Sequence, residues 1–165
     1  MVEMHVYKVA VDPQKHVPFV LLADEAIERI LPIYIGVFEA NAIASQLQGL
    51  DFPRPLTHDL MRTLLEEMGL RLDNVWITRL DEGVFYALLH IHGPATSLAL
   101  DARPSDAIAL ALRTHSPIFV AEEVLAEAQI LHADLQDASE TERLRDLLDD
   151  LPIPPDLLDA DEAEQ

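Results

Sequence analysis

The segment from Asn74 to Ile91 reads NVWITRLDEGVFYALLHI. Two runs rich in β-branched, aromatic and aliphatic residues, 74–80 and 84–91, flank the polar turn 81–83, which ends in glycine. Strand-forming runs on either side of a short glycine-containing turn predict a β-hairpin. Gly93-Pro94 turns the chain again, and residues 96–100 continue as a third strand.

Further strands are expected on both sides of this hairpin. Val2 to Val9 alternates apolar and polar residues, which predicts a half-buried strand. Val17 to Leu22 follows after a turn at residues 12–15 and forms a hairpin with it. Leu31 to Gly36 is a short buried strand that opens into a helix, and Pro117 to Val120 is another short strand.

Two helices are expected in the first half of the chain. The helix at 37–48 carries apolar residues at three-four spacing and ends at Gly49; these residues are Ala40, Ile43, Ala44 and Leu47. The next helix begins with Thr57 as its N-cap. It is expected to present one apolar face and to end at Gly69; the face consists of Leu60, Leu64, Leu65 and Met68.

Two more helices follow the hairpin. Residues 105–114 are apolar nearly all round the helix, so this helix should be buried, and Pro104 suits its first turn. A short helix is expected from Glu122 to Ala128. The order of elements favours an α+β fold, a mixed or antiparallel sheet of hairpins with packed helices, over a doubly wound parallel sheet.

The charge divides the chain into two parts. Residues 1–120 hold 15 acids and 9 Lys or Arg, a net charge of −6, whereas residues 121–165 hold 15 acids and 2 Arg, a net charge of −13. We therefore expect one domain at 1–130 and an acidic C-terminal tail at 131–165, helical around 141–150 and then disordered. The total of −19 repels nucleic acid at long range.

Composition also narrows the location and the chemistry. The chain has no cysteine, which excludes disulfides and thiolate metal sites and fits a reducing cytoplasm. The N-terminal residues lack the basic start and apolar run of a signal peptide. No run approaches the ~18 apolar residues of a membrane span, so no membrane association is expected.

Known cofactor motifs are absent. The five glycines are isolated, so there is no phosphate-binding glycine loop, and no Gly-x-Ser-x-Gly elbow occurs. His90 and His92 would share one face of a strand, an arrangement that suits a metal. With no third ligand apparent nearby, two histidines on a solvated face are the commoner interpretation.

The segment 53–59 is richer in chemistry. Arg54 lies between two prolines, and His58 and Asp59 fall in the first turn of a helix, where free backbone N–H groups attract anions. These groups can bind a phosphate and move a proton. Equally, Asp59 can favour the helix dipole and Thr57 can cap the helix.

The segment 101–106 has the same pattern. Asp101 ends a strand, Arg103 precedes a proline, and Ser105 and Asp106 begin the buried helix. Asp101 and Asp106 can share a divalent cation such as Mg²⁺ or Mn²⁺ with Glu39, or they can pair with Arg103 or Arg113. Glu39 lies on an otherwise apolar helical face and needs a partner, for which Arg54 or Arg103 is the obvious choice.

Three motifs, taken in order, resemble the bifunctional nuclease family over about residues 1–130. They are Leu31-Pro32-Ile33-Tyr34-Ile35-Gly36 followed by Glu39-Ala40, then Arg54-Pro55-Leu56-Thr57-His58-Asp59, then Asp101-Ala102-Arg103-Pro104-Ser105-Asp106-Ala107-Ile108. The resemblance implies cleavage of RNA and DNA, an activity associated with plant members. The residues that it carries over are Glu39, Arg54, His58, Asp59, Asp101, Arg103, Ser105 and Asp106.

Two functions remain open. In a divalent-metal-dependent nuclease acting on RNA or DNA, the catalytic residues would be Glu39, His58, Asp59, Asp101 and Asp106, with Arg54, Arg103 and Ser105 binding substrate. In a non-catalytic binding or regulatory module, the same residues would form ion-pair scaffolding or a small-anion pocket. Either function allows an oligomer, and the apolar strands together with the all-round apolar helix predict a homodimer or higher homo-oligomer.

Overall fold

The computed structural model describes residues 1–128. Seven strands and four helices occur in this part of the chain, in the order β1 (Val2–Val11), β2 (Pro18–Ala23), β3 (Ile30–Tyr34), α1 (Val37–Leu47), α2 (Thr57–Glu67), β4 (Arg71–Asp81), β5 (Val84–Gly93), β6 (Thr96–Ala102), α3 (Pro104–Thr114), β7 (Ile118–Val120) and α4 (Glu122–Ala128). Every element expected within residues 1–128 is present, with boundaries shifted by a few residues at most.

The strands of the described region form one mixed sheet in the order β3-β2-β1-β7-β4-β5-β6. The hairpin β4–β5 pairs Asp81 with Val84 across its turn, where Gly83 has a positive φ of 81°. β7 pairs antiparallel with β1 and parallel with β4, and so joins the two groups of hairpins. The expected α+β fold with a mixed sheet is confirmed.

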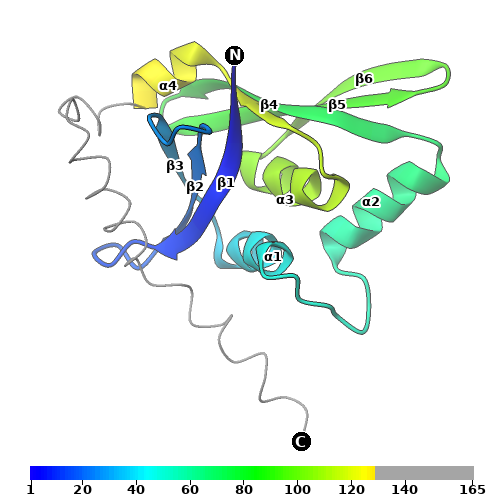
Figure 1. Ribbon diagram of the computed structural model, residues 1–165, viewed down its shortest axis with the longest axis horizontal. Coiled ribbons are helices and arrows are strands. Elements are labelled where there is room, and N and C mark those ends of the chain that lie inside the picture. Colours follow the sequence, from blue (N-terminus) through cyan, green and yellow to red (C-terminus); the bar gives the residue numbers. More distant parts are fainter. Residues whose placement is uncertain (129–165) are drawn as a thin grey trace, which may run out of the picture.

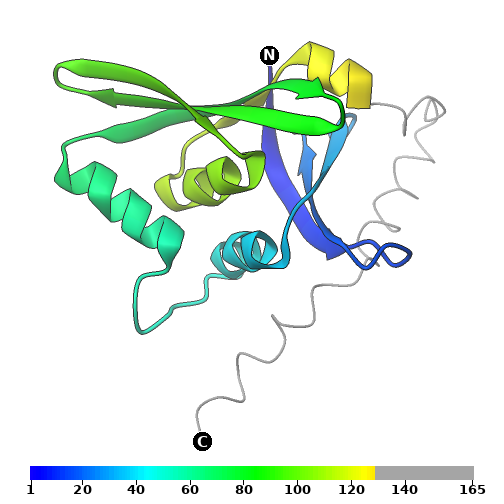
Figure 2. The ribbon, with the colours of Figure 1, turned by 180° about the vertical axis from the view of Figure 1, so that it is seen from behind.

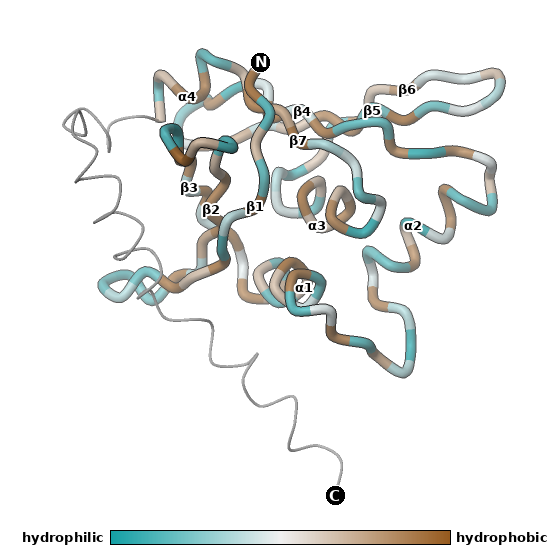
Figure 3. Tube along the Cα trace, viewed as in Figure 1, coloured by the Kyte–Doolittle hydropathy of each residue, from teal (hydrophilic) through white to brown (hydrophobic). Residues whose placement is uncertain are grey.

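Helices α1, α2 and α3 lie on one side of the long β4–β5–β6 ribbon in Figures 1 and 2. The hydropathy colouring of Figure 3 shows α3 as a largely apolar helix between that ribbon and α1. Residues 107–111 of α3 are at most 1% exposed, as its apolar sequence predicts. Pro104 is its first residue, where the missing N–H costs no intrahelical hydrogen bond.

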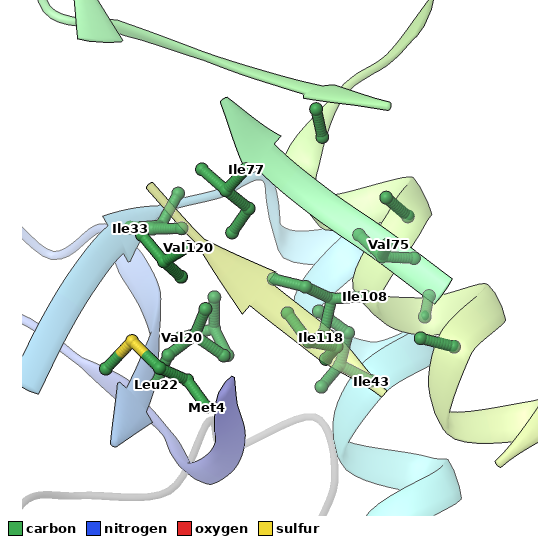
Figure 4. Close-up of a cluster of buried hydrophobic side chains, with 14 of the residues drawn as sticks. Met4, Val20, Leu22, Ile33, Ile43, Val75, Ile77, Ile108, Ile118 and Val120 are labelled. Carbon is green, nitrogen blue, oxygen red and sulfur yellow. The ribbon is translucent and has the colours of Figure 1, made fainter. Parts of the chain in front are cut away.

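One hydrophobic core joins both halves of the sheet to α1 and α3. Figure 4 shows Ile43 of α1 and Ile108 of α3 directed at the same cluster as strand residues that include Val75 and Val120. Ile43 and Ile108 are fully buried, and each such side chain stabilises the fold by roughly 1.5–3 kcal/mol. This packing holds the starts of α1 and α3 in fixed positions relative to each other.

The predicted N-cap of α2 is wrong, and its predicted apolar face is only partly right. Thr57 is its first helical residue and Leu56 is the N-cap, whose backbone N–H donates to the Asp59 carboxylate at 2.8 Å. Leu60, Leu64 and Met68 are 54–67% exposed, whereas Leu65 packs against the core as predicted, on the same helical face as the buried His58. Long-range contacts of His58 and Asp59, described below, fix this rotation.

Because α3 is covered within one chain, its apolar surface no longer argues for a dimer, and the homodimer stays a prediction. The acidic tail and its helix at 141–150 lie outside the described residues. No helix in residues 1–128 is long and apolar enough to cross a membrane.

Candidate functional site

An open cleft of about 690 Å³ lies where α1, α2 and α3 begin. Its wall includes the loop that joins α1 to α2. Four of the residues expected to carry chemistry line it: Glu39, His58, Arg103 and Asp106. They come from three helices and their caps, so the fold brings distant motifs to one place.

Arg103 lies between the two carboxylates of this group. Its Nε donates to Asp106 Oδ2 at 2.7 Å and its Nη2 donates to Asp106 Oδ1 at 3.1 Å. The same Nη2 lies 2.8 Å from Glu39 Oε1. The hydrogen bonds to Asp106, followed by the contact with Glu39, raise the pKa of Arg103. Arg103 is therefore the partner that an acid on the apolar face of α1 was expected to need.

His58 contacts the same carboxylate. Its Nε2 lies 3.2 Å from Asp106 Oδ1, and its side chain is 8% exposed. Burial by itself raises the pKa of Asp106, but hydrogen bonds from Arg103 and then His58 outweigh it and hold that pKa below its ordinary value. An ionised carboxylate only accepts hydrogen bonds, so Nε2 must carry the proton that faces it. In the neutral form of this ring the lone pair is therefore on Nδ1.

Asp59 belongs to a second network. It accepts a hydrogen bond from Arg113 Nε. Arg113 Nη1 also donates to the carbonyl oxygens of Ala42, at 3.0 Å, and Ala109, at 2.9 Å. Arg113 therefore ties α1, α2 and α3 together below the cleft. Burial raises the pKa of Asp59, but the hydrogen bonds from the Leu56 N–H and then Arg113 lower it by more. The pKa of Asp59 is therefore below its ordinary value.

The remaining candidates, Arg54, Ser105 and Asp101, do not line the cleft. Arg54 is exposed on the α1–α2 loop, and among the arginines of residues 1–128 it alone forms no ion pair. Ser105 is 6% exposed in the first turn of α3 and lines a shallower neighbouring pocket. Asp101 is exposed on β6, opposite Leu88, and does not line the cleft.

The arrangement does not fit a divalent ion held by Glu39, Asp101 and Asp106. Glu39 and Asp106 both contact the Arg103 cation, which lies where a metal would have to be. Nowhere in residues 1–128 do three His, Asp or Glu side chains form a group that could hold one. His90 instead packs its ring against Trp76, with centroids 4.2 Å apart.

Sequence reasoning missed the aromatic residues of the cleft and the role of Gly36. Phe38 and Phe52 line the cleft and are 86% and 46% exposed. A Cβ at Gly36 would collide with the Glu39 carboxylate, so glycine lets Glu39 fold back toward the start of α1. The sequence does indicate Phe38 in one way: it lies outside the three-four apolar spacing that marks the buried face of α1, and it is next to Glu39.

Acid should destabilise the domain through Asp59 and Asp106. Each has a folded-state pKa below its ordinary value of 3.8, so its stabilisation is complete above that value and is lost as the pH falls through the folded-state pKa. We expect the melting temperature to decline below about pH 4. Thermal unfolding of the wild type and Asp106→Asn between about pH 7 and 2 checks this. An unchanged acid limb in the variant would contradict it.

Comparison with known proteins shows which family this chain is similar to. Residues 20–133 match the model of the bifunctional nuclease domain, which covers most of the described region. An uncharacterized protein of Mycobacterium tuberculosis is 43% identical over 146 residues, which are 88% of this chain and 87% of that protein. Bifunctional nuclease 1 of Oryza sativa subsp. japonica is 29% identical over 112 residues, 66% of this chain and 34% of the rice protein.

Bifunctional nuclease 1 of Arabidopsis thaliana is 26% identical over 112 residues, again 66% of this chain and 34% of the relative. The match thus spans about a third of these plant proteins, whereas it spans most of the mycobacterial one. The matched range of the domain model contains all three sequence motifs and every residue of the cleft. The chain belongs to the bifunctional nuclease domain family.

Proposed function

We propose that this cleft hydrolyses phosphodiester bonds of RNA, DNA or both. The observation that carries the proposal is the convergence of Glu39, His58, Arg103 and Asp106, from three separate helices, on one open cleft. Membership of the family supports the same chemistry, because its plant relatives carry the name bifunctional nuclease.

Arg103 is the group suited to the phosphate. Its Nε and both hydrogens of Nη2 face the two carboxylates, whereas Nη1 forms no hydrogen bond within the described residues. Two N–H donors are therefore left for phosphate oxygens on a side chain that is 65% exposed. Glu39 and Asp106 hold the group in place, so its charge can stabilise the negative charge that develops in the transition state.

His58 is the group suited to proton transfer. In the proposed reaction its Nδ1 takes the proton of the attacking hydroxyl, from water or from a ribose 2′-OH, as that oxygen bonds to phosphorus. The protonated ring returns the proton to the oxygen that leaves as the other P–O bond breaks. Asp106 keeps the ring in the required tautomer and stabilises its charged form.

A non-catalytic module is the second candidate, and one observation favours it. Both carboxylates of the cleft are paired with Arg103, which is how an ion-pair scaffold would look. In that function the cleft would bind a small anion at Arg103 without turnover. Replacement of Arg103 would then chiefly change stability or anion binding.

The proposal is tested with the purified full chain on end-labelled single-stranded RNA and DNA. We expect cleavage activity that co-elutes with the protein and is lost in His58→Gln. Parallel reactions with Mg²⁺, Mn²⁺ and EDTA test the metal requirement, which stays a proposal. No cleavage under any of these conditions would leave only the non-catalytic function, and equal cleavage by the variant would show that His58 is not the proton-transfer group.

A further inference from the structure

Phe38 is the most exposed large apolar side chain in residues 1–128, at 86%. Phe52 is 46% exposed, and neither ring packs into a hydrophobic core cluster of the described region. A phenylalanine buries 150 Å² or more when it packs, so two open rings represent unused binding surface. Both line the cleft that also contains His58 and Arg103.

The rings are attached close to the proposed reacting groups. Phe38 directly precedes Glu39, whose carboxylate contacts Arg103 at 2.8 Å. Phe52 lies on the loop that carries Arg54 and leads into His58. The ring at Phe38 and the ring at Phe52 therefore approach the cleft from α1 and from the loop.

Arg54 adds a cation to this surface. It is exposed, and within residues 1–128 no acid pairs with it, in contrast to the other arginines. Pro53 and Pro55 on either side restrict the backbone of the loop, which limits the entropy lost when Arg54 contacts an anion. Arg54 does not itself line the cleft, but it lies two residues after Phe52 on the same loop. An unpaired cation on a loop that also carries an open aromatic ring suits a ligand with both negative charge and flat apolar faces.

We infer that Phe38, Phe52 and Arg54 form a binding platform for single-stranded nucleic acid. Unstacked bases pack on the two rings, and Arg54 contacts a backbone phosphate beside the one held by Arg103. This inference rests on the proposed function, because it names the form of substrate that the same cleft takes.

The acidic balance of the chain favours a single strand over a duplex. A duplex carries one charge per about 1.7 Å and presents no free base faces. A chain of net charge −19 repels such a rod strongly. Stacking on an aromatic ring does not depend on charge and is sequence-tolerant, so it can retain a single strand where phosphate contacts are few.

Fluorescence anisotropy with a labelled RNA of about 12 nucleotides tests the platform. The strand is used alone, annealed to its complement, and as an abasic backbone of equal length, with His58→Gln as the parent to prevent cleavage. Phe38→Ala and Phe52→Ala should each weaken binding of the single strand about tenfold. Arg54→Ala should reduce the salt dependence of binding by about one phosphate contact.

Leu60→Ala is the matched control, since Leu60 is 55% exposed and does not line the cleft. It should change the affinity less than about twofold. Equal affinity of the parent for the abasic backbone and the RNA would overturn the platform, as would unchanged affinity in both phenylalanine variants. A change of oligomeric state in Phe38→Ala without a change in affinity would assign that ring to contact between copies, and would also overturn it.

The binding measurement separates the two proposals. Ring-dependent binding by a chain that cleaves nothing would remove the nuclease function and keep the platform. Cleavage by the wild type with unchanged kcat/KM in Phe38→Ala and Phe52→Ala would keep the nuclease function and remove the platform.

Discussion

Replacing Asp59 with asparagine should lower the melting temperature by roughly 10 °C. The change leaves the charge of Arg113, whose side chain is 2% exposed, without a compensating carboxylate. Breaking a buried ion pair in this way costs about 3–5 kcal/mol. Asp59 is 24% exposed, so the lower end of that range applies, and each kcal/mol shifts the melting temperature of a chain this size by about 2–4 °C. Thermal unfolding followed by circular dichroism measures the effect.

Asp81→Asn is the control for this prediction. It breaks the Arg79–Asp81 pair, whose side chains are 56% and 55% exposed, so the cost should be about 1 kcal/mol or less. Equal small shifts for Asp59→Asn and Asp81→Asn would show that the Arg113 network does not hold the three helices together.

His58→Gln should lower kcat/KM for RNA or DNA cleavage by about 100-fold or more. Glutamine can still donate a hydrogen bond to Asp106 from nearly the position of Nε2, which lies 3.2 Å from Asp106 Oδ1. It cannot take up a proton, so the loss reports acid–base catalysis rather than the position of Asp106. Initial rates of cleavage of a labelled oligonucleotide, with circular dichroism to verify folding, give the comparison.

His92→Gln provides the matched control, because His92 is exposed on β5 and does not line the cleft. It should cleave as fast as the wild type. If His58→Gln is folded and equally fast, His58 is not the proton-transfer group and the mechanism proposed above is wrong.

Local patterns in the sequence predicted most of the fold. The turn at residues 81–83 and the apolar run of α3 are each recognised from a few consecutive residues. Both elements formed as expected. The place of β7 between β1 and β4 rests on pairings such as Val75 with Ile118, far apart in the chain. No local pattern encodes such a pairing, so the sheet order could not be obtained from the sequence.

The rotation of α2 shows the same limit. Its apolar residues alone predict a buried face with Leu60 and Leu64, but both are more than half exposed. The helix is turned so that His58 meets Asp106, 48 residues away, and Asp59 meets Arg113, 54 residues away. Met61 and Leu65 lie on the same face and pack against the core, so these polar contacts accompany burial of a different set of apolar residues from the predicted one.

The candidate site was found in the sequence through its motifs, but its geometry was not. The Arg103–Asp106 pair is local in sequence and was among the alternatives. Which acid pairs with which arginine depends on how three helices meet. In the structure Asp59 pairs with Arg113, and Glu39 pairs with Arg103. Phe38 was missed because an aromatic residue in an apolar segment is usually buried.

The most direct test of a catalytic cleft is Arg103→Ala, measured for cleavage and thermal stability in the same preparation. Arg103 is 65% exposed, so its ion pairs should contribute about 1 kcal/mol or less to stability. Its loss from the transition state should slow cleavage about 100-fold or more. We predict that the rate falls by this factor while the melting temperature changes by no more than about 3 °C. A rate equal to that of the wild type, or a fall in melting temperature with full activity in the folded fraction, would contradict the account and identify the cluster as a scaffold.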